Sequence, residues 1–326
     1  MPILQRQFED FHTKILFDVD SSQELRDRRD TLLNNLSDKI SDDAPAYDKF
    51  TQGSYALYTG IIPLGGNPDF DIGIHFDCST QDFADPLILK QYVADALKHE
   101  GRDIRIRKPC VTVTYKRNGQ AIHHVDLAIY VTDLWGQTKI AWGRDSDTLA
   151  NRTWETSKPK ELIGTITNRF SGDQRNQFRR CIRALKRWRD YKIGHGNLPS
   201  IGLTVAAFNT FSHCTNIADG KPMDILALRG IANGILGLWN GIRISVNLPV
   251  DPYNDLFQGM SDIQMNDFKD RLTSLRDALN DAYDHADTHE ACKNLQQHFG
   301  VDFPLPPKTE TTKKVPGGVA PSGRSA

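Results

Sequence analysis

The spacing of apolar residues divides the chain into two halves. Apolar residues recur at helical spacing over residues 4–40, with a second helix start near Ser21. Residues 69–77 alternate strictly, which predicts a strand with one apolar face and one acidic face. The further strands expected from such alternation all lie before residue 132. The first half is therefore predicted to mix strands and helices.

The remaining elements of the first half follow from the same patterns. We expect a turn leading into a helix over 51–60, a helix over 86–98, a strand over 104–115 interrupted by Pro109, and a strand over 121–131. The pair Asn118–Gly119 is typical of a tight hairpin turn and predicts that the last two of these strands pair with each other.

After about residue 155 the apolar spacing becomes helical. Helices are expected over residues 159–170, 173–192, 200–214, 223–242 and 262–298. The segment 308–326 has no large apolar residue other than two valines, so it cannot offset the entropy of ordering and is expected to be disordered. The sequence thus predicts three regions: an N-terminal helix with a strand-rich core (1–155), a helical lobe (156–306) and a disordered tail (307–326).

Composition narrows the classes of function. The 326 residues carry 40 Lys+Arg against 41 Asp+Glu, so no long nucleic-acid partner is expected. No apolar run reaches about 18 residues, and the N-terminus has charges within its apolar part. We therefore expect neither a membrane span nor a signal peptide, and a cytoplasmic location. The five cysteines are scattered, which argues against a disulfide framework and a zinc site.

Three aspartates on predicted strands are candidate metal ligands. Asp69 and Asp71 lie two residues apart, so their side chains point the same way and repel unless a cation neutralises them. Asp126 lies among apolar residues, where a carboxylate needs a partner or a metal. Oxygen ligands favour Mg²⁺ or Mn²⁺ over zinc. The alternative for each aspartate is an ordinary acidic position on the surface of a strand.

Two further features suit phosphate binding. Gly53–Ser54 precedes a helical stretch, where backbone N–H groups and a hydroxyl can face a phosphate. The predicted helix 173–192 has an apolar stripe and an adjacent basic flank that includes Lys186, and Ser200 begins the next helix. The basic flank either faces a polyphosphate or is simply solvated.

The order of these motifs resembles the nucleotidyltransferase superfamily related to DNA polymerase beta. Together with Lys186, Ser200 and the loop 248–256 (LPVDPYNDL), it resembles the cGAS/DncV-like nucleotidyltransferases, or CD-NTases. The resemblance implies an α+β fold: a polymerase-beta-like nucleotidyltransferase lobe, a helical C-terminal lobe and an active site in the cleft between them. It also implies that Asp69, Asp71 and Asp126 are catalytic and hold two Mg²⁺ or Mn²⁺ ions. The nucleotide-binding residues it implies are Gln52, Gly53, Ser54, Lys186, Ser200 and Asp251.

The resemblance further implies a function. The expected enzyme joins nucleoside triphosphates, ATP or GTP with pyrimidines left open, into a cyclic di- or trinucleotide with release of pyrophosphate. As a bacterial member it would serve CBASS antiphage defence: its product would act on a separate effector protein, and a ubiquitin-like ligase would conjugate its C-terminal tail. The alternatives are a linear oligonucleotide synthetase, an RNA-tailing enzyme and an inactive nucleotide-binding partner.

Overall fold

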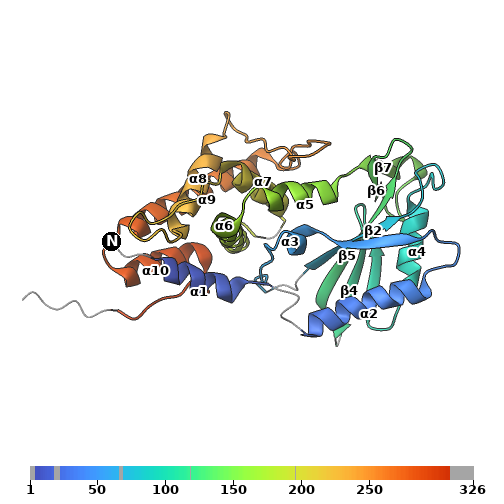
Figure 1. Cartoon of the computed structure of the whole chain (residues 1–326), viewed down its shortest axis with the longest axis horizontal. Coiled ribbons are helices and arrows are strands. Elements are labelled where there is room, and N and C mark those ends of the chain that lie inside the picture. Colours follow the sequence, from blue (N-terminus) through green and yellow to red (C-terminus); the bar gives the residue numbers. More distant parts are fainter. Residues whose placement is uncertain (1–3, 18–22, 66–68, 118, 195, 309–326) are drawn as a thin grey trace, which may run out of the picture.

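A mixed β-sheet and a helical lobe lie next to each other in the molecule (Figure 1). The computed structural model describes residues 4–17, 23–65, 69–117, 119–194 and 196–308. The predicted α+β fold is confirmed: the described strands all lie between residues 47 and 156, and the helices after residue 156 build the second lobe. The predicted tail, 307–326, falls almost entirely outside the described residues.

The sheet contains seven strands in the described part of the chain. Its central order is β1-β2-β5-β4-β3, β6 pairs with the end of β5, and β7 pairs with β6. The strands are β1 (Tyr47–Thr51), β2 (Asp69–Phe76), β3 (Arg102–Ile106), β4 (Val111–Arg117), β5 (Gln120–Thr132), β6 (Thr138–Trp142) and β7 (Thr153–Thr156). The pair β2–β5 is parallel and the other pairs are antiparallel, so β2 and β5 run side by side at the centre of the sheet.

One face of the sheet forms the core of this lobe. Ile72 and Ile74 of β2 and Leu127 of β5 are buried there against the helices α2 (Gln23–Lys39) and α4 (Leu87–Ala96). The predicted alternation is therefore confirmed, because the apolar positions of both strands face this core. The acidic positions consequently lie on the opposite face of the sheet, which the helices α2 and α4 leave uncovered.

The second lobe has its own apolar core, in which Trp188 is fully buried. Its helices are α5 (Pro159–Asn168), α6 (Gly172–Lys192), α7 (Ser200–Thr210), α8 (Asp224–Gly237), α9 (Asp262–Asp284) and α10 (Thr288–Phe299). The N-terminal helix α1 (Gln5–Ile15) packs into this core as well, with Phe11 against Phe299 and Phe303 at ring-centroid distances of 5.2 Å. The domain boundary at residue 155 stays a prediction.

The structure differs from the predicted elements in three places. The predicted strand 104–115 is two paired strands, β3 and β4, because the chain turns back around Pro109. The predicted helix 262–298 is two helices, since the Asp287 side chain accepts hydrogen bonds from the N–H groups of His289 and Glu290 and starts α10. The short strands β1, β6 and β7 were not predicted, because half-exposed segments of four or five residues have too little alternation to detect.

No helix among the described residues is both long enough and apolar enough to span a lipid bilayer.

Candidate active site

A large cleft opens between the acidic face of the sheet and the helical lobe. Its cavity volume is about 1110 Å³. The walls come from the short helix α3 (Gly53–Ala56), from β2, β5, β6 and β7, from α5, α6 and α7, and from the loop 248–254. Eight of the nine predicted site residues line it, namely Gln52, Gly53, Ser54, Asp71, Asp126, Lys186, Ser200 and Asp251. The side chain of the ninth, Asp69, lies outside the described residues.

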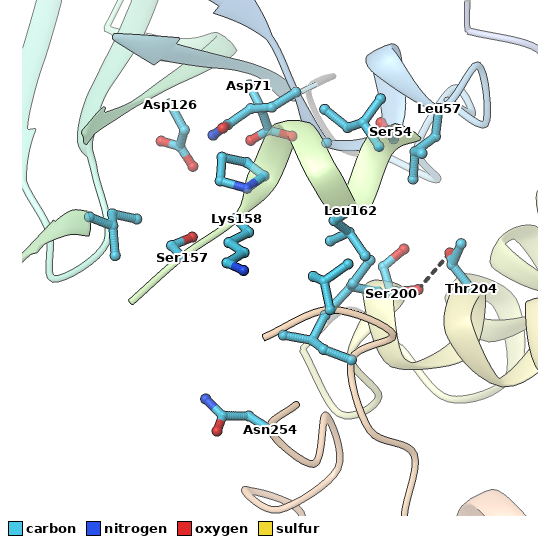
Figure 2. Close-up of a pocket in the computed structure, with 18 of the residues that line it drawn as sticks. Ser54, Leu57, Asp71, Asp126, Ser157, Lys158, Leu162, Ser200, Thr204 and Asn254 are labelled. Atoms are coloured by element: carbon cyan, nitrogen blue, oxygen red, sulfur yellow. Dashed lines mark hydrogen bonds between the residues drawn. The ribbon is translucent and has the colours of Figure 1, made fainter. Parts of the chain in front are cut away.

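Two carboxylates face the cleft from adjacent parallel strands. Asp71 of β2 lies directly opposite Asp126 of β5 in the strand register. Neighbouring strands are about 4.8 Å apart, and both side chains leave the sheet on the face opposite the buried Ile72 and Leu127. Figure 2 shows the two carboxylates side by side at the top of the cleft. The sequence placed them on separate strands, and the parallel pairing brings them together.

Asp126 is held in place by a threonine on the next strand. Thr112 lies opposite Asp126 in the register, and its hydroxyl donates to Oδ1 at 2.6 Å. The buried thiol of Cys110 lies 3.6 Å from the Thr112 hydroxyl. Burial, followed by the negative charge of Asp126, raises the pKa of Cys110 to about 12, so this thiol stays protonated. The Thr112 hydroxyl thus orients one carboxylate oxygen of Asp126.

The donor set fits a hard divalent cation. The backbone of Asp69 lies opposite His124 at the start of β2. Within the described residues, no group of three His, Cys, Asp or Glu side chains has a metal-binding arrangement. Asp71 and Asp126 supply two carboxylates, the oxygen-only type of ligand that Mg²⁺ and Mn²⁺ prefer. The roles of all three aspartates remain predictions.

Gly53 lies in direct contact with Asp71. Its φ is +64°, and a Cβ on this residue would lie 1.9 Å from Asp71 Oδ2. The N–H of Gln52 donates to the carbonyl of Asp71 at 3.1 Å, which fixes the turn against β2. The turn that carries Ser54 can therefore lie against the carboxylate only because residue 53 has no side chain.

Tyr130 stabilises the same turn by a hydrogen bond to the side chain of Gln52. It is buried on β5, and its hydroxyl donates to Gln52 Oε1 at 3.0 Å. Burial raises the pKa of Tyr130, so the hydroxyl keeps its proton and remains a donor. Gln52 itself lines the cleft. The sequence analysis did not single out Tyr130, although it follows Asp126 at a same-face spacing of four residues on a strand.

Two residues of the basic flank of α6, Arg183 and Lys186, and the adjacent Arg187 bond the backbone of a neighbouring segment. Arg183 donates to the carbonyl of Tyr58, Lys186 Nζ donates to the carbonyl and hydroxyl of Thr59 at 3.0 and 3.2 Å, and Arg187 donates to the carbonyl of Ile62 at 2.8 Å. All three side chains are buried. They fasten the segment 58–62, which follows the Gly53–Ser54 turn, to the helical lobe. The expectation of a solvated flank is wrong for Arg183 and Lys186.

Lys186 is the member of this flank that also lines the cleft. It is 5% exposed. Burial, followed by the guanidinium groups of Arg189 and Arg183, lowers the pKa of Lys186 to about 7. An ammonium group in this position is therefore poorly stabilised by the protein alone. A polyanion in the cleft would favour its protonated form.

The start of α7 and the loop 248–254 form the wall of the cleft on the side of the helical lobe. Ser200 begins α7, and its carbonyl accepts from the Thr204 hydroxyl at 2.9 Å (Figure 2). Asp251 lies in the loop 248–254, where its carboxylate is 3.9 Å from Lys158 Nζ. Lys158 precedes α5 and was not predicted; in sequence it is one of several lysines before a helix and carries no distinguishing signal. Nucleotide binding by Asp251 remains a prediction.

Comparison with known proteins identifies the lobe that carries the carboxylates. Residues 48–130 match the sequence family described as "Cyclic GMP-AMP synthase DncV-like, nucleotidyltransferase domain". That segment runs from β1 to Tyr130 and includes the Gly53–Ser54 turn and all three aspartates. The expected resemblance to cGAS/DncV-like nucleotidyltransferases is confirmed for this domain.

Solved structures with the same fold cover nearly the whole chain. The Vibrio cholerae DncV cyclic AMP-GMP synthase, a prokaryotic cGAS homologue, is 18% identical with a TM-score of 0.62, over 92% of this chain and 86% of that one. The Escherichia coli DncV with bound 3′-deoxy GTP is 18% identical with a TM-score of 0.63, over 92% and 88%. The V. cholerae enzyme in complex with the linear intermediate 5′ pppA(3′,5′)pG is 18% identical with a TM-score of 0.62. The match covers 92% of this chain and 86% of that one. At this identity the likeness establishes the two-lobed fold.

Proposed function

We propose that this protein joins nucleoside triphosphates into a cyclic di- or trinucleotide. The proposal starts from the DncV-like nucleotidyltransferase domain that residues 48–130 match. ATP and GTP are the proposed substrates, because V. cholerae DncV is a cyclic AMP-GMP synthase and structures of it hold GTP and a linear A–G intermediate. Each bond would form by attack of a ribose hydroxyl on an α-phosphate, with pyrophosphate as the leaving group.

One observation supports this proposal above the others. Asp71 and Asp126 face the cleft side by side, and the turn that carries Gly53 and Ser54 touches Asp71. A carboxylate pair beside a glycine–serine turn provides metal ligands and phosphate donors within one triphosphate's length. A surface strand with acidic positions would not require a glycine fitted against a carboxylate.

Different residues along the cleft are proposed to bind the phosphates, to accept the proton and to hold the metal ions. Ser54 and the NH₂ group of Gln52 donate to the β- and γ-phosphates, and Lys186 supplies a positive charge to the same end, where Ser200 also lies. Asp126, oriented by Thr112, accepts or directs the proton of the attacking hydroxyl. Asp69, Asp71 and Asp126 would hold two Mg²⁺ or Mn²⁺ ions. When bound, such ions acidify the attacking hydroxyl and offset the charge of the leaving pyrophosphate.

Ring closure follows from the same set of groups. A linear intermediate that keeps its 5′-triphosphate presents that triphosphate to the turn at Gly53. Attack by its own terminal ribose is then intramolecular and gains from the held geometry. No extended basic groove for a polymer is implied by the formal charge of −1.

Product analysis tests this proposal. The full chain is incubated with ATP, GTP, CTP and UTP and Mg²⁺ or Mn²⁺, and the products are treated with alkaline phosphatase and examined by mass spectrometry. We expect a phosphatase-resistant species whose mass equals the summed nucleoside monophosphates minus one water per bond. A ladder of phosphatase-sensitive oligomers would instead identify a linear synthetase or tailing enzyme, and no product would identify an inactive nucleotide-binding protein.

The biological setting belongs to the proposal as well. A cyclic nucleotide made in the cytoplasm would act on a separate effector protein in CBASS antiphage defence. The C-terminal tail would be the site of conjugation by a ubiquitin-like ligase. A chain ending at Lys308 should synthesise product at the full rate and lose conjugation in cells; full conjugation of that chain would exclude the tail as the acceptor.

A further inference from the structure

One end of the cleft is built by β6 and β7 and takes no part in the phosphate and metal binding described above. Ile140 and Trp142 of β6 and Glu155 of β7 line the cavity there. Ile140 lies opposite Glu155 in the register and Trp142 lies opposite Thr153, so these side chains share one face. The face combines an indole ring, an aliphatic side chain and a carboxylate.

The strand register fixes how far this face lies from the carboxylate pair. Tyr130 lies opposite Ile140, which lies opposite Glu155, and Tyr130 follows Asp126 by four residues on β5. With ~3.3 Å per residue along a strand and ~4.8 Å between strands, the Cα atoms of Asp126 and Glu155 are roughly 16 Å apart. One nucleoside and two extended side chains can bridge that distance.

The Glu155 carboxylate is oriented but keeps acceptor capacity. The Thr153 hydroxyl donates to its Oε1 at 2.6 Å. Asp190 and Asp251, two other acids that line the cleft, each have a cationic partner. Glu155 has no ion pair with any residue that the structure describes. Its carboxylate is therefore the acid at this end that remains available to hydrogen-bond donors of a ligand.

The direction of the reaction decides which nucleotide reaches this end. Figure 2 shows Ser54 and Ser200 toward one side of the cleft, and Asp126 and Ser157 toward the other. In phosphoryl and nucleotidyl transfer the attacking and leaving oxygens lie roughly in line. If the leaving pyrophosphate is held at Ser54, the attacking ribose enters from the side of Asp126. The base of the acceptor nucleotide then points to β6 and β7.

We propose that Glu155 reads the base of the acceptor nucleotide and selects guanine, with Trp142 as the surface on which the base stacks. The inference rests on the nucleotidyl transfer proposed above. Among the four standard bases, only guanine presents two adjacent N–H donors, N1–H and the 2-amino group, on its Watson–Crick edge. A carboxylate accepts both. Adenine and cytosine each place an acceptor beside their amino group, which a carboxylate repels.

An acceptor-competition assay with the full chain tests this selection. The α,β-methylene triphosphates of guanosine and adenosine serve as acceptors that cannot act as donors, and radiolabelled natural triphosphates serve as donors. A bidentate contact of this kind discriminates by about 1–3 kcal/mol, which is roughly 5- to 150-fold. We expect the unmodified protein to prefer the guanine acceptor by that factor and Glu155→Gln to lose the preference. Glu100→Gln, the same change at an exposed position outside the cleft lining, should keep it.

Direct binding separates this inference from the proposed reaction. The affinities of GMP and IMP, which lacks the 2-amino group, are measured by calorimetry for the unmodified protein and for Glu155→Gln. Tighter binding of GMP that disappears in Glu155→Gln supports the inference even if no product forms and the proposed reaction fails. A cyclic product whose acceptor preference is the same in both proteins overturns the inference and leaves the proposed reaction standing.

Discussion

Gly53 and Asp71 are in such close contact that a single methyl group at residue 53 would overlap the carboxylate. The built Cβ position lies 1.9 Å from Asp71 Oδ2, and the φ of +64° is in the left-handed region that favours glycine. The contact joins the Gly53–Ser54 turn to the strand that carries Asp71. These two parts of the site therefore cannot move independently of each other.

Gly53→Ala should abolish synthesis and weaken Mn²⁺ binding, because the methyl group displaces either the turn or the carboxylate. Gly65→Ala is the matched control: its φ is +61°, and a Cβ there meets nothing within 4 Å. Both variants carry a backbone cost of about 1–2 kcal/mol for a left-handed alanine. Equal activity of the two variants, measured beside their melting temperatures, would show that backbone strain alone explains any loss.

Asp69→Asn, Asp71→Asn and Asp126→Asn should each abolish product formation while the melting temperature stays close to that of the unmodified protein. Residues that act as one unit lose activity non-additively, so the double variant of Asp71 and Asp126 should be no worse than either single variant. Rate measurements with and without excess EDTA check this prediction. Near-normal turnover in a single variant, or activity in EDTA, contradicts the carboxylate mechanism.

Thr112→Val should weaken Mn²⁺ binding by about tenfold, because the hydroxyl that orients Asp126 is lost while the volume is kept. Metal titration followed by electron paramagnetic resonance measures this effect without turnover. Thr114→Val is the comparison, since Thr114 lies on the same strand and bonds His124 instead. If both variants bind Mn²⁺ equally well, the orientation of Asp126 does not depend on Thr112.

Lys186→Met should lower both nucleotide affinity and stability. The buried ammonium bonds both oxygens of Thr59, so its removal leaves the Thr59 carbonyl without that donor. From the sequence, Lys186 lies on a basic flank, so its removal opens no core cavity and is expected to weaken nucleotide use more than folding. An unchanged melting temperature in Lys186→Met would contradict the expected loss of stability and support an effect on nucleotide use alone.

The contribution of Lys186 to the free energy of unfolding depends on pH in one direction. Its pKa is lowered to about 7 in the folded protein, so between pH 7 and the ordinary value of 10.5 the unfolded chain binds more protons. Stability from this group therefore rises with pH from about 7 to 10.5. Nucleotide binding should take up a proton in the same range and weaken as the pH increases. Calorimetry in buffers of different ionisation enthalpy measures the uptake, which should vanish in Lys186→Met.

Acidification should destabilise the helical lobe. Burial lowers the pKa values of His12 and His298 to about 4, with Arg183 as the next largest cause for His12 and Lys192 for His298. Between pH 6.5 and 4 the unfolded chain binds more protons at these positions, so stability falls as the pH falls through that window. Urea midpoints at pH 7 and pH 5 test this, and His298→Gln should reduce the difference.

The sequence by itself determined which faces of the two central strands carry the acidic positions. Strict alternation predicted the strand that carries Asp69 and Asp71, because a period of two fixes which side chains share a face. The same argument placed Asp126 on a polar face opposite Val125 and Leu127. The Gly–Ser pair was visible because glycine is required only where the backbone conformation or a close approach excludes a side chain.

Only the tertiary structure decided which residues meet. The pairing of β2 with β5 aligns Asp71 with Asp126 across 55 positions of sequence, and no local pattern encodes that register. The burial of Lys186 against Thr59 likewise depends on how α6 meets the sheet lobe. Glu155 reaches the cleft through β6 and β7, strands too short to predict. Local spacing sets which face a side chain occupies, whereas contacts between distant segments depend on the packing of the whole chain.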